Sequence, residues 1–236
     1  MNSVLKQFLE PLNAPAYSIA ETKRLTGVAR SSVNYYLRGY EYKYPTKEQS
    51  HYRTIPSVIN QSDAGSTYAS FLDLMDLLYI KEFLARGFHL QFLRKALAEA
   101  KKFLGTPHFA TNEFYTSKDR IILKVPQNSA LIQLMTGGQF TIPEITEKLS
   151  AKLDFADAAH LGLVQRFYPN GKSGAIVIDP QISFGRPTLV GYSIATSNIY
   201  DLFLGEDQKI EPVSKWFNIP VPEIRAAVQF EQRLWA

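Results

Sequence analysis

Hydrophobic and polar positions near the N-terminus follow the spacing of a short amphipathic helix. Ser18 is followed three residues later by Glu21, which is the spacing of a capping box and predicts a helix start at that point. Such a helix has one apolar face that packs inward. The predicted inward residues are Ile19, Ala20 and Leu25.

A second short helix is predicted over residues 30–37, directly after a turn. Gly27 allows the left-handed backbone that a tight turn requires, and Val28 is expected to close that turn against the core. Val33 and Leu37 then point inward at i and i+4. The residues left for the outside are Arg30, Ser31, Asn34, Tyr35 and Arg38. Two short helices joined by a glycine-containing turn predict a helix-turn-helix.

Residues 40–59 show the period of a strand near their start, where Tyr40, Tyr42 and Tyr44 stand at every second position before Pro45. This alternation favours a short strand pair, which would form a wing beside the two helices. The polar, glycine-containing stretch 61–66 is predicted to be a linker. We therefore expect a winged helix-turn-helix domain over residues 1–70.

The middle of the chain, residues 71–165, is predicted to be a helical and hairpin region that links or dimerises. Helical periodicity runs over 71–104 and breaks at Gly87, which predicts two helices with a bend. A hairpin is expected over 107–125. Short helical stretches are expected over 128–149, with a helix start at Thr141.

The last third, residues 166–236, is predicted to be a separate C-terminal domain. A turn at 170–172 and a strand at 175–178 precede three predicted helices, over 197–204, 210–217 and 222–234. The predicted fold class is therefore mainly α with small β-hairpins, an α+β protein with helix-turn-helix-like units at both ends.

Charge separates the two ends of the chain. The net charge is +4, and residues 1–60 hold eight lysines and arginines against four acidic residues, whereas the remaining residues are balanced at 18 and 18. Such an asymmetry indicates that the N-terminal end meets a polyanion. With 45% hydrophobic residues, the chain is long enough to bury a substantial core.

Several function classes are disfavoured by the residues present. The chain has no cysteine, and its four histidines are far apart in sequence, so neither a thiolate site nor a paired histidine metal site is expected. Gly171-Lys-Ser lacks the upstream glycine of a P-loop and is interpreted as a turn. The carboxylate pairs Asp73/Asp76 and Asp154/Asp157 are expected on helices, as caps or facing solvent. No enzyme activity, cofactor or metal is expected. The absence of a long apolar run or signal peptide favours the cytoplasm.

Residues 17–105 resemble the MerR-like winged-helix group. The resemblance is carried by YSIAE at 17–21, by GVARSSVNYY at 27–36, by SFLDLM at 70–75 and by FLARGF at 83–88. It implies that the first domain binds operator DNA.

The C-terminal stretch is similar to an antitoxin-associated domain of formerly unknown function. The matching residues are IDPQISFGRPTLVGYSI at 178–194 and VPEIRAAVQFE at 221–231. Together the two matches resemble long VapB-type antitoxins, which implies a PIN-domain ribonuclease toxin as partner. Many members have Gly-Thr-Arg at a point where this chain has Gly191, Tyr192 and Ser193. The basic side chain is missing there, which disfavours a nucleic-acid role of this domain.

The geometry of a helix-turn-helix, in which the second helix enters the major groove, assigns DNA-contacting roles to individual residues of the first domain. The predicted base-contacting residues are Arg30, Ser31, Asn34 and Tyr35, and the predicted phosphate contacts are Lys23, Arg24, Arg38, Lys43 and Arg53. A homodimer on a roughly palindromic operator is expected, made by residues 71–104 or 128–163.

The predicted toxin anchors are the large aromatic residues of the C-terminal domain, because such residues dominate interface hot spots. They are Trp216, Phe217, Phe230 and Trp235. Two other functions remain open at this stage: a MerR-like regulator with a small-molecule sensor and no toxin, and an enzyme or nuclease built from scattered residues.

Overall fold

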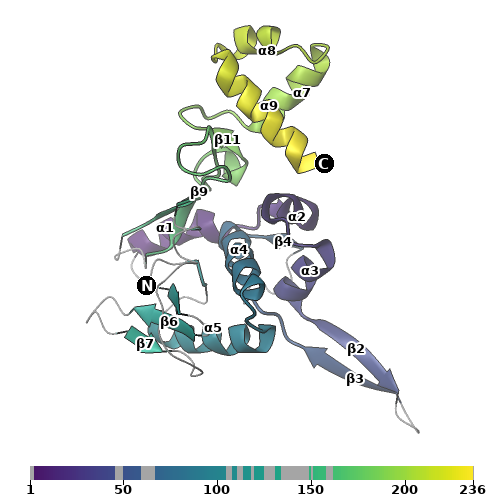
Figure 1. Cartoon of the computed structure of the whole chain (residues 1–236), viewed down its shortest axis with the longest axis vertical. Coiled ribbons are helices and arrows are strands. Elements are labelled where there is room, and N and C mark those ends of the chain that lie inside the picture. The colour runs from purple at the N-terminus through teal and green to yellow at the C-terminus, as the bar shows by residue number, and fades with distance from the viewer. Residues whose placement is uncertain are drawn as a thin grey trace.

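The structure of the protein is a computed structural model, and the residues that it describes are 3–45, 50–59, 67–104, 108–110, 114–117, 120–124, 131–133, 149, 151–157 and 162–235. Its architecture is α+β and mainly helical, as predicted, with small antiparallel strand pairs (Figure 1). Its buried hydrophobic residues form two cores. The first lies in a body that includes α1 to α5, and the second lies in a C-terminal module that includes α7 to α9.

The two predicted N-terminal helices are present. The elements of this region are α1 (Ser3–Asn13), β1 (Tyr17–Ser18), α2 (Ile19–Thr26), α3 (Arg30–Arg38), β2 (Tyr40–Pro45), β3 (Ser50–Ile55) and β4 (Tyr68–Ala69). Ser18 and Glu21 form the capping box of α2, and Gly27 ends that helix in the left-handed region at φ 65°. Val33 and Leu37 of α3 are buried, as their spacing predicts.

The inward face of α2 differs from the prediction in one residue. Ala20 is exposed, and the fully buried positions are Thr22 and Thr26. Their hydroxyls donate to the backbone oxygens of Ser18, at 2.9 Å, and of Thr22, at 2.6 Å. Because each hydroxyl finds an acceptor within its own helix, threonine can be buried where an apolar residue was expected.

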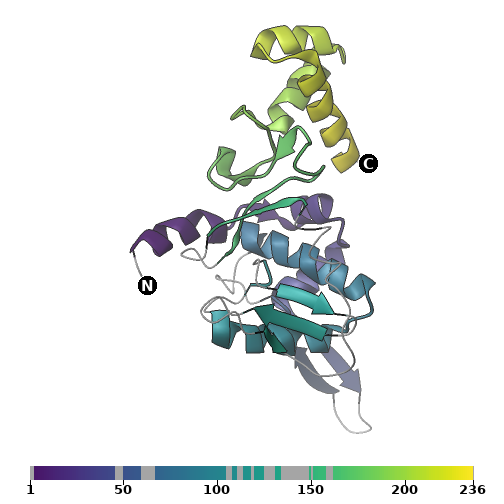
Figure 2. The same ribbon diagram turned by 60° about the vertical axis from the view of Figure 1, so that its left-hand side comes forward.

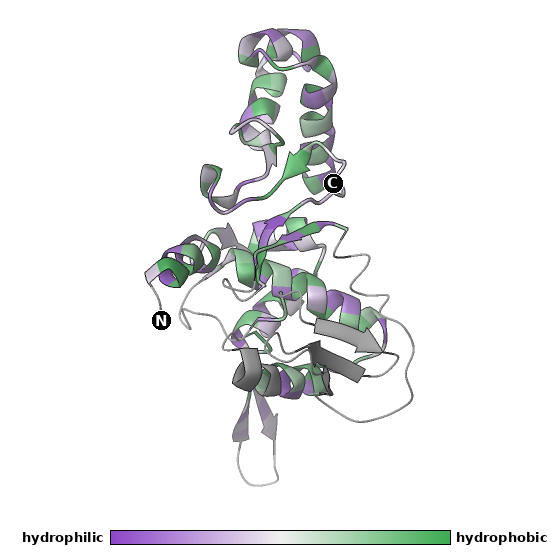
Figure 3. Ribbon diagram, turned by 90° about the vertical axis from the view of Figure 1, so that its left-hand side faces the viewer, coloured by the Kyte–Doolittle hydropathy of each residue, from purple (hydrophilic) through white to green (hydrophobic). Residues whose placement is uncertain are grey.

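The hairpin β2–β3 pairs Tyr40 with Ile55 and ends at Pro45 and Ser50. It projects away from the body at the end opposite the C-terminal module (Figure 1). Hydrophilic colours cover it in Figure 3. The predicted linker 61–66 lies outside the described residues.

Helix α4 (Phe71–Ala85) forms the centre of the first core, and α5 (Leu90–Leu104) follows after the predicted break. Asp73 caps α4, but Asp76 does not face solvent as expected. Its side chain is fully buried, 2.7 Å from the Nδ1 atom of His108, and it accepts from the backbone N–H of Ala110 at 3.0 Å. Burial raises the pKa of Asp76. Burial lowers the pKa of His108, but the charge and hydrogen bond of Asp76 outweigh this and raise it.

The middle region contains the predicted hairpin, formed by β5 (Phe114–Ser117) and β6 (Arg120–Lys124). A third strand, β7 (Leu131–Gln133), pairs with β6, so the prediction of helical stretches is wrong there. The predicted helix start at Thr141 lies outside the described residues. Asp154 lies on a strand and not on a helix, in the pair of β8 (Leu153–Phe155) and β9 (Val164–Phe167).

The C-terminal module has the three predicted helices, α7 (Thr196–Gly205), α8 (Ile210–Phe217) and α9 (Val221–Trp235). They pack over the strand pair β10 (Ile176–Val177) and β11 (Thr188–Leu189), with the short 3-10 helix η2 (Ser183–Gly185) between these strands. The first core extends beyond the predicted boundary at residue 166, because it includes Phe167 and Ile178. Figure 2 shows the module above α2 and the β8–β9 pair.

Within the described part of the chain, the helices are all too short or too polar to cross a lipid bilayer.

Candidate functional site

The first turn of α3 is an open polar surface. Arg30 and Ser31 are exposed there, and Ala29, the residue before the helix, offers no side chain to cap it. Asn34 lies one turn further on, and its amide donates to the backbone oxygen of Arg30 at 3.3 Å. Three of the four predicted base-contacting residues therefore lie at the N-terminal part of α3, as the spacing predicts.

Tyr35, the fourth, is placed differently. It is half-buried, and its hydroxyl accepts from the Nη2 atom of Arg94 at 2.8 Å, while the Nε atom of Arg94 donates to the backbone oxygen of Ser57 at 3.3 Å. Tyr35 also packs edge-on against Tyr40, with ring centroids 4.8 Å apart. Its hydroxyl is thus already engaged, and the residue joins α3 to the hairpin and to α5.

The hairpin carries two of the predicted phosphate contacts on opposite faces. Lys43 is exposed and faces Tyr52 across the pair, whereas Arg53 is exposed and faces Tyr42. Successive residues of a strand point to opposite sides, so Arg53 shares its face with Tyr40, Tyr42 and Tyr44. Arg38, at the end of α3, is exposed near the base of the hairpin.

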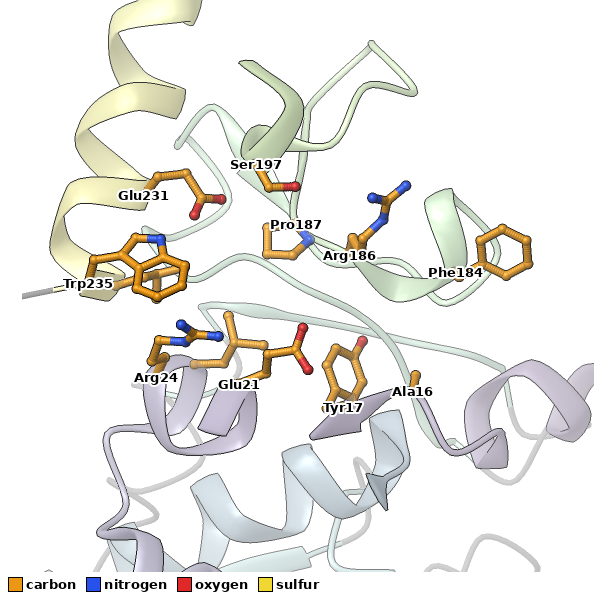
Figure 4. A pocket seen from close by; sticks show the side chains of 12 residues that line it. Ala16, Tyr17, Glu21, Arg24, Phe184, Arg186, Pro187, Ser197, Glu231 and Trp235 are labelled. Atoms are coloured by element: carbon orange, nitrogen blue, oxygen red, sulfur yellow. The ribbon is translucent and has the colours of Figure 1, made fainter. Parts of the chain in front are cut away.

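Lys23 is exposed on α2, but Arg24, one residue on, has a contact that the sequence does not reveal. Its guanidinium carbon lies 4.0 Å from the ring centroid of Trp235, at the end of α9 (Figure 4). This is a cation–π contact between a predicted phosphate ligand and a predicted toxin anchor. In this structure the guanidinium group of Arg24 and one face of the Trp235 ring are therefore engaged with each other.

The C-terminal module has two further contacts with this region, one with β1, which precedes α2, and one with α2 itself. Tyr17 is buried, and its hydroxyl donates to the backbone oxygen of Gly185 at 2.7 Å. Gly185 has φ +76°, and a Cβ at this position would lie 2.4 Å from the Tyr17 hydroxyl, so the close approach requires glycine. Leu25 packs against both hydrophobic cores. The module therefore covers the face of α2 that points away from α3.

A cavity of about 130 Å³ lies between α2 and the module, and its residues come from both sides (Figure 4). Its lining includes Glu21 and Arg24 from the body, and Arg186, Glu231 and Trp235 from the module. Burial raises the pKa of Glu231, although the hydroxyl of Thr196 donates to its carboxyl group and favours the charged form. The cavity thus combines apolar walls with both signs of charge.

The four predicted toxin anchors separate into three environments. Trp216 and Trp235 are exposed, with 76% and 65% of their surface accessible, and Phe217 is half-buried against the second core. Phe230 is buried in that core, so its prediction as a surface anchor is wrong: it falls on the inward face of α9 with Ile224 and Ala227.

In the C-terminal module, the sequence does not single out Phe184 as exposed, yet this residue is 89% accessible and has a left-handed backbone at φ 58°. A phenylalanine in that conformation is uncommon, because its Cβ crowds the backbone. The only sequence signal near it is the glycine that follows, Gly185.

Comparison with known proteins gives a fold but no family. No protein-family model matches the chain, and no curated protein matches it. The crystal structure of Rv2018 from Mycobacterium tuberculosis is similar, with a TM-score of 0.57 and 17% sequence identity over 92% of this chain and 99% of that one. At this identity the similarity concerns the arrangement of the chain in space.

Proposed function

We propose that this chain is the antitoxin of a toxin-antitoxin pair, that it represses its own operon by binding DNA and that it neutralises a PIN-domain ribonuclease. The observation that carries the DNA-binding part is the exposed first turn of α3, which holds Arg30 and Ser31 at the start of the helix that leads into the projecting hairpin β2–β3. In a helix-turn-helix, this turn reaches base edges in the major groove, while a neighbouring basic hairpin grips phosphates. The surplus of basic residues before residue 61 supports the same assignment.

The first test is binding of the full chain to the duplex upstream of its own gene over a range of salt concentrations. Phosphate contacts release counterions, so the affinity should fall steeply and linearly on a double-logarithmic plot. A flat response to salt would contradict the electrostatic basis of the proposal.

A second test separates base contacts from phosphate contacts. Arg30→Ala should cost about 1–3 kcal/mol on the operator and relax the sequence preference, whereas Lys43→Ala should weaken binding to every duplex alike. Equal losses on operator and unrelated duplex for both variants would show that the two roles are misassigned.

The toxin part rests on the family resemblance, and the exposed Trp216 supports it. A tryptophan with 76% of its surface accessible fits a buried position in a complex better than a solvent-facing position in a monomer. Deleting residues 166–236 is a poor test, because the cut would fall within β9 and would uncover Leu25. We therefore propose Trp216→Ala and Lys209→Ala, the latter as an exposed control, in co-expression with the neighbouring open reading frame. Loss of co-purification with the first variant alone is expected; retention by both would place the toxin contact elsewhere.

One observation favours the second candidate, a regulator that senses a small molecule. The cavity between α2 and the module is lined by apolar residues together with Arg24, Arg186 and Glu231, as a ligand site would be. A thermal-shift screen of small metabolites against the full chain tests this, with Trp235→Ala as the site variant. Absence of a neighbouring toxin gene together with a stabilising ligand would favour the sensor.

A further inference from the structure

The hairpin β2–β3 carries a continuous row of aromatic side chains on one face, which we name the aromatic strip. Neighbouring ring centroids along it are 4.8, 6.0, 6.0 and 5.7 Å apart. The strip consists of Tyr35, Tyr40, Tyr42, Tyr44 and His51. It begins on α3 and follows strand β2 outward, so the candidate recognition helix and the strip form one continuous surface.

The strip is open to solvent. Tyr40, Tyr42 and Tyr44 each keep between 37% and 46% of their surface accessible, and the hairpin projects from the body (Figure 1). A row of exposed rings on a thin two-stranded arm contributes no core of its own. Aromatic rings that are exposed together in one row, with no core to join, mark an interaction site.

The charge of the strip indicates which partner it fits. Arg53 lies on the same face, opposite Tyr42, and it is the charged residue of that face among those described. Glu41 lies on the opposite face, where its carboxylate accepts from the hydroxyl of Thr54 at 3.1 Å. The rings are therefore accompanied by a positive charge and no negative one, which is complementary to a polyanion.

We propose that the aromatic strip is a binding site for single-stranded nucleic acid, with unpaired bases stacked on Tyr40, Tyr42 and Tyr44 and with Arg53 on the phosphates. Aromatic rings beside a cation are the combination by which proteins hold single strands without reading their sequence. In a duplex the base faces are already stacked on one another, so the rings of the strip would find no free face. The strip therefore selects strands with unpaired bases.

This activity is separate from duplex binding by the first turn of α3, and it does not depend on that assignment. Arg30 lies at the opposite end of α3 from Arg38 and the base of the hairpin. Variants at Arg30 and variants on the strip should thus affect different ligands.

The test is fluorescence anisotropy of the full chain with labelled oligothymidylate of about 16 nucleotides, a length that spans such a site. The double variant Tyr42→Ala/Tyr44→Ala should bind it at least about 30-fold more weakly, because each lost ring removes one stacking contact. Tyr42→Phe keeps the ring and should bind as the unmodified chain does. Tyr52→Ala, on the opposite face and more exposed, is the matched control.

A second readout does not depend on the variants folding. Oligonucleotides that carry 5-iodouracil should cross-link, on irradiation, to peptides that contain Tyr42 or Tyr44 in the unmodified chain. Failure to bind the oligonucleotide, or cross-links confined to other segments, would overturn the proposal. So would loss of duplex binding alone in the double variant, or a change of its oligomeric state by light scattering, since these outcomes would assign the strip to duplex DNA or to a second copy of the chain.

Discussion

Helices α2 and α3 are neighbours of similar length, and both carry arginine, yet their outer surfaces differ in accessibility. The C-terminal module lies on α2, where Leu25 contacts it and Arg24 meets Trp235, and Tyr17 of the preceding strand β1 also bonds to it. Among the described residues, no element covers the first turn of α3 in this way, and Arg30 is exposed. Basic residues that look equivalent in a sequence can therefore have different uses: one holds two parts of the chain together, and the other is available to a ligand.

The largest expected effect comes from the close approach of Tyr17, on β1, to Gly185 in the module. Gly185→Ala would place a Cβ 2.4 Å from the Tyr17 hydroxyl, and it would put alanine at a positive φ, which alanine disfavours. The free energy of unfolding, measured by urea titration, should therefore fall by about 2–4 kcal/mol.

Gly191→Ala is the matched control for this change, because Gly191 has φ +80° but nothing within 4 Å of its added Cβ. Its free energy of unfolding should fall only by the cost of an alanine at positive φ, about 1 kcal/mol. Equal losses in the two variants would mean that the contact with Tyr17 contributes nothing.

The next effect compares the two arginines directly in duplex binding. Arg30→Ala should cost about 1–3 kcal/mol on the operator, as for a base contact. Arg24→Ala should cost less than about 0.5 kcal/mol, because its guanidinium is held over Trp235 and a group that is already occupied adds little. Titration of both variants with the same duplex checks this, and a larger loss for Arg24→Ala would reverse the comparison.

A smaller effect is expected from removing one hydroxyl at the covered surface. Tyr17→Phe leaves the backbone oxygen of Gly185 buried without its donor, so the free energy of unfolding should fall by about 1–2 kcal/mol. Tyr52→Phe, at an exposed ring on the hairpin, should leave it unchanged. Urea titrations of both variants provide the measurement, and an unchanged Tyr17→Phe would show that water satisfies that oxygen.

The smallest effect concerns Glu231. Burial raises the pKa of its carboxyl group above the ordinary value. A carboxyl group with a raised folded-state pKa contributes stability that is present below its unfolded pKa and is lost as the pH rises through the folded one. Glu231→Gln should therefore match the unmodified chain in acid and be more stable by up to about 1 kcal/mol at neutral pH, while it still accepts from Thr196. Thermal melts from acid to neutral pH test this, and a destabilised variant at neutral pH would show that the charge is needed.

Local signals account for what the sequence predicts well. The capping box of Ser18 and Glu21, the turn at Gly27 and the three C-terminal helices each depend on residues within a few positions, so periodicity and cap chemistry suffice to find them. The exposed start of α3 follows from the same pattern.

Contacts between distant residues account for what was missed. Asp76 meets His108 at a separation of 32 residues, and Tyr17 meets Gly185 at 168, and neither pair has a local signature. For the same reason, the sequence does not predict that the C-terminal module covers α2. In the sequence, Arg24 resembles any exposed arginine of a helix. Phe230 was misplaced because one aromatic residue on an amphipathic helix fits either face until the neighbouring elements are known.

The hydrogen bonds of Arg94 tie the base of the hairpin to α5. Arg94 holds the hydroxyl of Tyr35 on α3 and the backbone oxygen of Ser57 after β3, and the backbone oxygen of Tyr36 accepts from the N–H groups of Val58 and Ile59 at 2.8 and 2.9 Å. Both ends of the hairpin are thereby tied to one side chain of a long helix. The direction in which the hairpin leaves the body is therefore set partly by a residue of α5, outside both the hairpin and α3.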